Sequence, residues 1–534
     1  MTNFLFTFLR LSILVLLIEC KSFAGQIIYV DDDSKGANDG LSWADAFNYL
    51  QDALASATYG DSIHVAQGIY TPDRGIGFTA GDRQANFSLK NGVAIHGGFA
   101  GFGEPDPNER DIEKYKTILS GDLTGNDIEV KDPCDLQWFQ PTRAENSGNV
   151  IIGINADETA VLDGFTITAG YNSMVARNGN GPIGGAGMLN RSSSPTIINC
   201  TFAGNAAIIY NVGAGLFNSQ GSKPILVNCR FTGNCASING AAIYNIESAP
   251  KLINCVFYCN YAKSGSGIYN RNSNPVISGC TFINNSNSAI YNYSNSNPIL
   301  NNCTFVKNTS RFGAGMYNEN SSPKLTGCAF IGNIATLYGG GMFNGEGSYP
   351  SLFNCIFSGN SAEQGGGIFN LRRNSSLSLN NCTFSSNSVR LDGSGVYSYG
   401  EMTVTNCIFW GNVDPAIIGE AAVTVTYSDI QGGWSGEGNI NIDPLFSDPG
   451  YWDPNGTPDD PNDDLWIDGD YHLKSQAGRW DPVSQSWIQD DITSPCIDAG
   501  DPNTPVGDEP FPNGGIINMG SYGGTAEASK SPTN

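Results

Sequence analysis

The sequence predicts an all-β protein: a right-handed parallel β-helix with an N-terminal capping helix and an irregular C-terminal cap. The first observation is a motif, Cys-x-Phe-x-x-Asn, that occurs nine times at spacings of 23 to 29 residues. A repeat of this length indicates stacked solenoid coils. The motif begins at Cys200, Cys229, Cys255, Cys280, Cys303, Cys328, Cys355, Cys382 and Cys407.

The second observation is an Asn or Gly directly before each of these cysteines. Apolar and variable residues alternate on both sides of this position, as they do in β-strands. Asn and Gly tolerate a left-handed backbone, so one such residue can turn the chain between two short strands. We therefore expect a one-residue corner in every coil. The corner residues are Asn199, Asn228, Asn254, Gly279, Asn302, Gly327, Asn354, Asn381 and Asn406.

Stacking of the coils at about 4.8 Å turns each repeated position into a ladder. The Cys and Phe ladders are expected inside, where each buried Phe contributes roughly 1.5–3 kcal/mol. The Asn that closes each motif is expected to hydrogen-bond along its column and to have a structural role. A leucine-rich horseshoe is disfavoured, because the sequence lacks its Leu-x-x-Leu-x-Leu signature and its helical half-repeat.

Residues 1–24 have the pattern of a secretory signal peptide. Leu11–Ile18 form its apolar region, and Ser22–Ala24 form a small-x-small cleavage site. No later stretch is long and apolar enough to span a membrane. We therefore expect a secreted or cell-surface protein.

Residues 25–183 are predicted to form an N-terminal cap and irregular first coils. Ser42 and Asp45 resemble a capping box, and a helix here would cover the open end of the β-helix. Its apolar face would contain Trp43, Ala46, Phe47, Leu50, Leu54 and Ala57. Long insertions separate the first coils and carry most of the early arginines; they span 71–86, 100–116, 123–148 and 171–182.

Residues 184–430 are predicted to form the regular coils, each with a Gly/Ala-rich step that ends in an aliphatic residue and an aromatic residue. Alternation points the aromatic residue outward, where a strip of rings could stack on sugars. Alternatively, loops cover the strip, or it lines the core. The aromatic column is Phe217, Tyr244, Tyr269, Tyr291, Tyr317, Phe343, Phe369 and Tyr397. The candidate glycan contacts are Tyr244, Tyr269, Tyr291, Tyr317 and Tyr397.

Residues 431–534 are predicted to form a C-terminal cap and tail rich in Asp and Trp. Between positions 429 and 509 there are 18 acidic residues and two basic ones. Turn-rich segments with many oxygen ligands suit hard cations, so the sequence raises the possibility of a Ca²⁺ site. A merely solvated acidic loop is the alternative. The candidate ligands are Asp453, Asn455, Asp459, Asp460, Asp463 and Asp464.

The net charge of −24 argues against nucleic acid as a partner and suits a protein that binds cations or remains soluble in salt. The nine ladder cysteines are expected to be buried thiols. In an in-register parallel ladder their Cβ atoms stand about 4.8 Å apart, outside the usual disulfide range. The only plausible bridges are then Cys235 with Cys259 and Cys134 with Cys496.

The F-x-x-N and G-G/A-x-I motifs resemble the repeats of polymorphic outer-membrane proteins, which share the β-helix of the pectin-lyase superfold. The wider chain resembles secreted bacterial β-helix proteins. The segments that carry this resemblance are 28–31, 40–46, 494–500 and 518–524. The resemblance implies the fold over nearly the whole mature chain and leaves the activity open, because this fold hosts lyases, hydrolases, adhesins and tail spikes.

Residues 191–400 contain only five acidic residues and no histidine. Hydrolases need paired carboxylates and lyases need a base, often with bound Ca²⁺. We therefore expect a non-catalytic protein that binds glycan or another extracellular surface. The alternative is a polysaccharide lyase or glycoside hydrolase that acts through the N-terminal insertions. Its candidate residues are Arg74, Arg83, Arg143 and Arg177, unless these are solvated loop charges.

Overall fold

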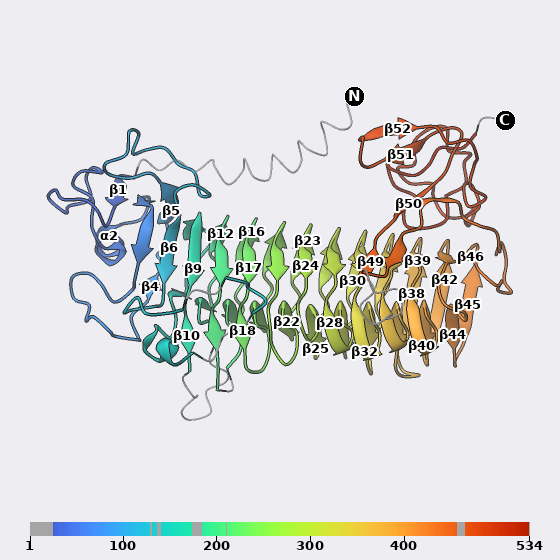
Figure 1. Ribbon diagram of the computed structural model, residues 1–534, viewed down its shortest axis with the longest axis horizontal. Helices are drawn as coiled ribbons and strands as arrows, with labels where there is room; N and C mark the ends of the chain where they lie inside the picture. Colours follow the sequence, from blue (N-terminus) through green and yellow to red (C-terminus); the bar gives the residue numbers. More distant parts are fainter. Residues whose placement is uncertain are drawn as a thin grey trace.

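The computed structural model describes residues 25–128, 131–135, 140–173, 184–209, 211–455 and 465–532. The predicted signal peptide, 1–24, lies outside these ranges. Over the described residues the chain winds into an elongated stack of coils, a parallel β-helix (Figure 1). Three long parallel sheets run along it, and we name them sheets A, B and C.

Sheet A is the longest, and it begins with the first strand of the described chain. Its strands are β1 (Ile27–Val30), β2 (Ser62–Ala66), β5 (Ala94–Phe99), β8 (Val161–Asp163), β12 (Thr196–Ile198), β16 (Ile225–Val227), β20 (Lys251–Ile253), β23 (Val276–Ser278), β26 (Ile299–Asn301), β30 (Lys324–Thr326), β34 (Ser351–Phe353), β38 (Ser376–Asn380), β42 (Glu401–Thr405) and β45 (Val423–Thr426).

In the regular coils, sheet B follows sheet A directly after the corner residue, and it carries the Phe ladder. Its strands are β3 (Gly68–Tyr70), β6 (Thr117–Ser120), β9 (Phe165–Thr168), β13 (Thr201–Ala203), β17 (Arg230–Thr232), β21 (Val256–Tyr258), β24 (Thr281–Ile283), β27 (Thr304–Val306), β31 (Ala329–Ile331), β35 (Ile356–Ser358), β39 (Thr383–Ser385), β43 (Ile408–Trp410) and β46 (Asp429–Ile430).

Sheet C contains the aromatic column. Its strands are β4 (Phe87–Ser88), β7 (Ile151–Ile154), β11 (Met188–Arg191), β15 (Leu216–Ser219), β19 (Ile243–Ile246), β22 (Ile268–Arg271), β25 (Ile290–Tyr293), β29 (Met316–Glu319), β33 (Met342–Asn344), β37 (Ile368–Asn370), β41 (Val396–Ser398) and β44 (Ile417–Gly419).

Between sheets B and C two shorter parallel sheets add extra strands to some coils. The first contains β10 (Tyr171–Asn172), β14 (Ala206–Ala207) and β18 (Cys235–Ala236). The second contains β28 (Thr309–Phe312), β32 (Ile334–Tyr338), β36 (Ser361–Gln364) and β40 (Ser388–Asp392). The second sheet lies beside the aromatic column, and its ring contacts are described below.

The predicted corners are confirmed. All nine corner residues between sheets A and B have φ between 48° and 63°. A second left-handed corner follows the Phe ladder, one residue before each ladder Asn, and the sequence analysis missed it. Glycine occupies many of its positions, but Cys259, Lys307 and Ser386 occupy others, with φ near 51° to 54°. This mixture of residue types hid the column.

The core is built as predicted from ladders. Every Phe of the nine motifs is fully buried, and successive rings stack with centroids 4.4–5.1 Å apart. The nine ladder cysteines are buried free thiols. Both ladders belong to one hydrophobic core that continues from coil to coil. Each added coil therefore extends the same core rather than starting a new one.

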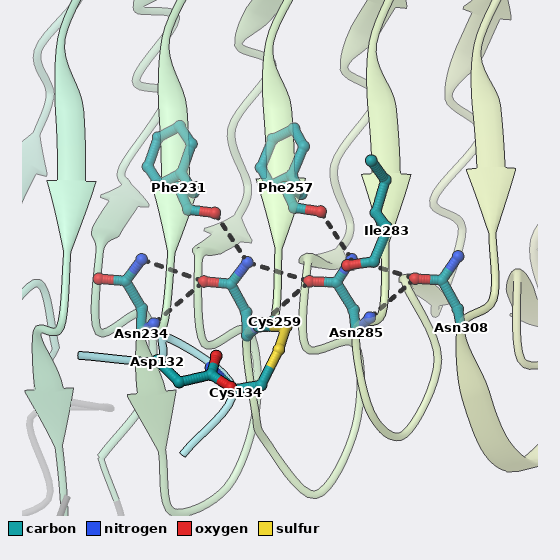
Figure 2. Close-up of a disulfide and its surroundings, with 10 residues drawn as sticks. Asp132, Cys134, Phe231, Asn234, Phe257, Cys259, Ile283, Asn285 and Asn308 are labelled. Atoms are coloured by element: carbon teal, nitrogen blue, oxygen red, sulfur yellow. Dashed lines mark hydrogen bonds between the residues drawn. A yellow bond between two sulfur atoms is a disulfide. The ribbon is translucent and has the colours of Figure 1, made fainter. Parts of the chain in front are cut away.

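The Asn of each motif is structural, as expected. From Asn205 to Asn387, each Nδ2 donates to the Oδ1 of the Asn in the next coil at 2.9–3.1 Å. The same Nδ2 donates to the Phe carbonyl oxygen of the preceding coil, for example from Asn285 to Phe257 at 2.9 Å (Figure 2). A second Asn ladder in sheet C joins Asn190 to Asn344 at 2.8–3.0 Å.

The disulfide differs from both predicted pairings: Cys134 bonds Cys259 (Figure 2). The residue that pairs with Cys235 in the next coil is Tyr261. Cys259 lies two residues before Tyr261, at the second corner, and so does not face Cys235. Cys496 remains a buried thiol whose Sγ donates to Asp429 Oδ2 at 3.2 Å. Both pairings were wrong because the sequence shows neither this register nor the course of the insertion that carries Cys134.

The N-terminal helix is shorter than predicted. Helix α2 spans Leu50–Ser56, and its N-cap, Tyr49, makes no side-chain capping bond. Ser42 Oγ accepts from the backbone N–H of Asp45 at 3.2 Å and donates to Asp45 Oδ2 at 3.0 Å, and these bonds close a turn that precedes the helix. Leu50 and Leu54 enter the core of the first coils. Figure 1 shows α2 at the N-terminal end of the stack.

Only part of the region after the last coil lies at its end. Ile440 pairs with Asp429, and Trp434 packs against the main core. The described residues from 446 onward instead fold back along the side of the later coils (Figure 1). Their strands are β47 (Phe446–Asp448), β48 (Tyr451–Asp453), β49 (Leu465–Ile467), β50 (Asp470–Leu473), β51 (Arg479–Asp481) and β52 (Ser486–Ile488).

We name the described residues from 446 onward the lateral body. Some of the predicted corner residues bind it to the β-helix, and we call this contact the seam. Asn354 Nδ2 donates to the carbonyl oxygens of Ser521 and Gly523, both at 2.7 Å. In the next coil, Asn381 Nδ2 donates to Asn518 O at 3.0 Å. An apolar cluster that includes Ile408 and Met519 completes the contact. The seam therefore uses corner amides that face solvent in other coils.

Candidate functional site

The aromatic column points away from the core, as predicted, but most of it is covered. Its residues form clusters of their own outside the main core. Phe217, Tyr244, Tyr269, Phe343, Phe369 and Tyr397 are buried, whereas Tyr291 and Tyr317 are half-buried. The rings stack on one another at 4.2–5.8 Å. A sugar ring therefore cannot stack on the faces inside the column.

The second side sheet covers the later part of this column with its own rings. Phe312 of β28 lies 5.4 Å from the Phe343 ring, and Tyr338 of β32 stacks on Phe369 at 4.5 Å. Tyr399, just after β41, meets Phe369 edge-on at 6.1 Å. The half-buried rings of Tyr338 and Tyr399 thus form a second aromatic layer that reaches solvent.

A groove of about 710 Å³ lies over this second layer. We name it the aromatic–arginine groove. Its lining is Tyr338, Glu346, Gln364, Phe369, Leu371, Arg372, Arg373, Asn374 and Tyr399. The side strands supply one wall, and the loop after β37 supplies the other. A volume of this size lies within the usual range for a small-molecule binding site.

The polar side chains of the groove remain available to a ligand. Arg372 and Arg373 are exposed, and neither forms an ion pair within the described part of the chain. Asn374 Nδ2 donates to Glu346 Oε1 at 3.4 Å. Burial raises the pKa of nearby Glu319, while the positive charge of Arg372 opposes that shift. The groove therefore presents guanidinium, amide and carboxylate groups beside aromatic rings.

Each of the three candidate N-terminal arginines that the structure describes is engaged in contacts, and Arg83 and Arg143 both lie near Tyr171. Arg74 is half exposed and, among the described residues, forms its ion pair with Asp73, at 3.7 Å. Arg83 donates from Nε to Asn146 O at 2.8 Å and serves to hold two insertions together. Arg143 pairs with Asp127 at 3.4 Å and donates to Gly204 O at 2.6 Å. Arg177 lies outside the described residues.

Another charged cluster in the first coils is also engaged in contacts. Arg110 Nη2 donates to Asp163 Oδ2 at 2.7 Å, and His96 Nδ1 lies 3.2 Å from the same oxygen. Burial lowers the pKa of neighbouring His64 to about 4. These contacts fasten the 100–116 insertion to sheet A.

The structure places only two of the candidate Ca²⁺ ligands. Asp453 Oδ1 accepts a hydrogen bond from the backbone N–H of Asn455 at 3.0 Å, which forms a local turn. Asp459, Asp460, Asp463 and Asp464 lie outside the described residues. Among the described residues, no three His, Cys, Asp or Glu side chains are arranged to hold a metal ion. The Ca²⁺ site stays a prediction.

Sequence reasoning missed Tyr338, Gln364, Arg372, Arg373 and Tyr399. One signal was present: Arg372 and Arg373 are the only adjacent pair of basic residues in the sequence. The other three residues follow no repeat position, because the groove depends on side strands that only some coils possess.

Comparison with known protein families supports the fold. The family described as "Right handed beta helix region" matches residues 139–305 and 184–344. With the parallel sheets above, this makes the stack a right-handed parallel β-helix. The family described as "Disaggregatase related" matches residues 455–500. No curated protein matches the chain.

Two solved structures resemble the chain over most of its length. One is titled "Crystal structure of pectate lyase Pel9A", with 14% identity, 93% of this chain and 96% of that chain covered, and a TM-score of 0.33. The other is titled "Rhamnogalacturonan lyase", with 10% identity, 85% and 97% covered, and a TM-score of 0.32. At these scores neither likeness bears on activity. Among the described residues, no helix has the length and hydrophobicity to cross a membrane.

Proposed function

We propose that this protein is an extracytoplasmic, non-catalytic β-helix that binds polysaccharide in the aromatic–arginine groove. The observation that carries the proposal is the meeting of two half-buried tyrosines with two exposed arginines, which form no ion pair with any described residue, in a groove of about 710 Å³. Tyrosine offers an apolar ring and a hydroxyl at low entropic cost. Guanidinium and amide groups hydrogen-bond to hydroxyl or carboxylate oxygens.

The half-buried Tyr291 and Tyr317 extend the aromatic surface of sheet C toward the N-terminal end. Tyr317 hydrogen-bonds to Glu319 at 3.2 Å, so its hydroxyl is already oriented. We include these two tyrosines as secondary contacts. Tyr244, Tyr269 and Tyr397 are too buried for direct stacking on sugar, and we assign them to support of the column.

Two observations support an extracytoplasmic location. The first is the signal-like sequence of residues 1–24. The second is the Cys134–Cys259 disulfide, because disulfides persist in oxidising compartments and are rare in reducing ones. The two observations are independent of each other.

The test is a panel of neutral, acidic and amino polysaccharides, assayed for both retention of the protein and appearance of new chain ends. We expect retention on at least one polymer without cleavage. The Arg372→Ala, Arg373→Ala double variant should lose that retention, whereas Lys324→Ala, which removes an exposed base from β30, should keep it. If the double variant is retained as strongly as Lys324→Ala, the groove is not the binding site.

The second candidate is a polysaccharide lyase or hydrolase acting through the N-terminal insertions. It is favoured by one observation: Arg143 lines a cavity together with Asp122 and Asp127. Polymer cleavage that is abolished by Arg143→Ala, and left intact by the groove variant, would establish this alternative in place of our proposal.

A further inference from the structure

The insertion around residues 122–146 is fastened to the side of the β-helix at several points. The Cys134–Cys259 disulfide joins it to the second corner (Figure 2). Arg143 Nη2 donates to Gly204 O at 2.6 Å, and Asn146 Nδ2 donates to Ala169 O at 2.8 Å. The disulfide holds the middle of the insertion, and the two hydrogen bonds hold its C-terminal end. The described residues of the insertion (122–128, 131–135 and 140–146) therefore form a wall over the outer face of sheet B.

A cavity of about 440 Å³ lies between this wall and sheet B. Its apolar lining includes Ile69, Ile118, Ala169 and Ala203 from the coils, with Ile128 and Pro133 from the wall. Its polar lining includes Asp122, Asp127, Arg143, Thr168 and Thr232. The cavity lies among the first coils, whereas the aromatic–arginine groove lies on later coils between sheet C and the side strands, so the two are separate sites.

Two buried oxygen atoms of this lining lack a hydrogen-bond partner within the described part of the chain: Asp127 Oδ1 and Thr232 Oγ1. The side chain of Asp127 is 13% exposed. Its other oxygen, Oδ2, accepts from Asn146 Nδ2 at 2.7 Å and lies 3.4 Å from Arg143 Nε. Because an unsatisfied buried carboxylate oxygen is costly, it indicates a missing donor.

The charge around the cavity is negative. Arg143 provides one positive charge beside the carboxylates of Asp122 and Asp127. Glu145 lies close by, and burial, followed by the negative charges of Asp122 and Asp127, raises its pKa. A cationic donor is therefore favoured over a neutral or anionic one.

We propose that this cavity binds a small primary amine. Its ammonium group would donate to Asp127 Oδ1 and Thr232 Oγ1, and its carbon frame would lie on the isoleucine and alanine floor. An ammonium group has three donors and no acceptor, which matches two unpaired oxygens. A bare metal ion fits less well, because the described residues offer no group of three ligands and the floor is apolar.

The test uses three probes of nearly equal size that differ in one group: n-butylamine, butan-1-ol and butyrate. Binding to the oxidised full-length mature protein at pH 7 is measured by saturation-transfer NMR titration. We expect the amine to bind at least tenfold more tightly than the alcohol, and butyrate not to bind. Equal binding of alcohol and amine, stronger binding of butyrate, or displacement of the amine by stoichiometric Ca²⁺ would each overturn the proposal.

Variants locate the site. Asp127→Asn keeps the side-chain size and removes the charge, and should weaken amine binding at least tenfold. Thr232→Val, on a sheet strand where valine is well tolerated, should weaken it several-fold. Asp508→Asn makes the same charge change at an exposed position far along the chain and should have no effect. If Thr232→Val and Asp127→Asn both bind the amine as the wild type does, the cavity is not the site.

Discussion

At the residue scale, each turn of the β-helix depends on one left-handed residue between sheets A and B. Asn and Gly fill that position in all nine regular coils. The Cys and Phe that follow this position point into the core, where each packs against the equivalent residue of the neighbouring coils. Because one contact is repeated along the ladder, the loss of a single ring leaves a void between two others that cannot easily close.

Phe305 and its neighbour Thr304 form a matched pair for this argument. Phe305 is fully buried, whereas Thr304 lies on the outer face of β27 and is half-buried. Phe305→Ala should lower the free energy of unfolding by about 3–5 kcal/mol, and Thr304→Ala should change it little. Denaturant titration followed by circular dichroism measures both. Similar costs for the two changes would contradict the interior placement of the ladder.

Glu509 makes the stability of the lateral body depend on pH. Its Oε1 accepts from the N–H groups of Asn518 and Gly524, each at 2.8 Å, while Oε2 is buried without a partner among the described residues. Burial raises its pKa to about 7. Because the pKa is higher in the folded state, its stabilisation is full below pH 4 and is lost as the pH rises through about 7.

Glu509→Gln should remove this dependence. Between pH 5 and pH 9 the wild type should lose roughly 2–3 kcal/mol that the variant keeps. Tryptophan fluorescence during urea unfolding follows the transition, because five of the eight tryptophans lie after residue 431. Parallel pH profiles for the two proteins would show that Glu509 is ionised in the folded state at neutral pH.

The repeated positions also show which features of the fold could be predicted from the sequence alone. Corners, the Cys and Phe ladders and the Asn ladders were predictable, because each repeats one residue type at one position. The second corner was not, since any residue that tolerates the strain is used there, including Lys307. The Cys134–Cys259 bond was not, because it joins a non-repeating insertion to a corner position.

At the element scale, insertions and side strands give the uniform coils their local differences. The 122–146 insertion builds a cavity on sheet B, and the second side sheet builds a groove next to sheet C. Neither element repeats along the whole chain. Sequence periodicity therefore predicted the scaffold, whereas both candidate sites depend on segments that interrupt the period.

The disulfide should stabilise the insertion. Its two cysteines are 125 residues apart in sequence, and closing so long a loop is worth about 2–4 kcal/mol. The Cys134→Ser, Cys259→Ser double variant should therefore unfold at lower denaturant and become sensitive to protease near residue 134. Reducing agent should lower the denaturant midpoint and raise the protease sensitivity of the wild type, and it should change neither property of the variant. Equal sensitivity of both proteins to reducing agent would argue against this pairing.

The lateral body should depend on Gly359. A Cβ atom at this corner would lie 2.2 Å from the Trp466 ring, while Gly411, two coils later in the same column, has open space apart from Ser386 Oγ at 3.1 Å. Both residues are left-handed, and Asn284 shows that asparagine fits this column. Gly359→Asn should release residues 446–531 to limited proteolysis, whereas Gly411→Asn should not. If residues 446–531 are equally protected from protease in the two variants, they do not pack against Gly359 as described.

At the scale of the whole molecule, a long stack of coils carries an acidic body along one side of its later coils (Figure 1). The body covers sheet B and the A–B corners there. The aromatic–arginine groove lies in the same coils on the sheet C side, formed by β32, β36, β37 and the loops that follow β37 and β41. The lateral body therefore leaves the groove uncovered on the sheet C side, where the proposed polysaccharide would bind.

The most direct measurement is isothermal titration of the polysaccharide selected by the panel against matched variants. The triple variant Arg372→Ala, Arg373→Ala, Tyr399→Ala should bind at least tenfold more weakly than the wild type. Tyr349→Ala, which removes an exposed tyrosine outside the groove, and Arg143→Ala should bind as the wild type does. Unchanged affinity in the triple variant, or loss of binding in Arg143→Ala alone, would contradict the assignment of the groove.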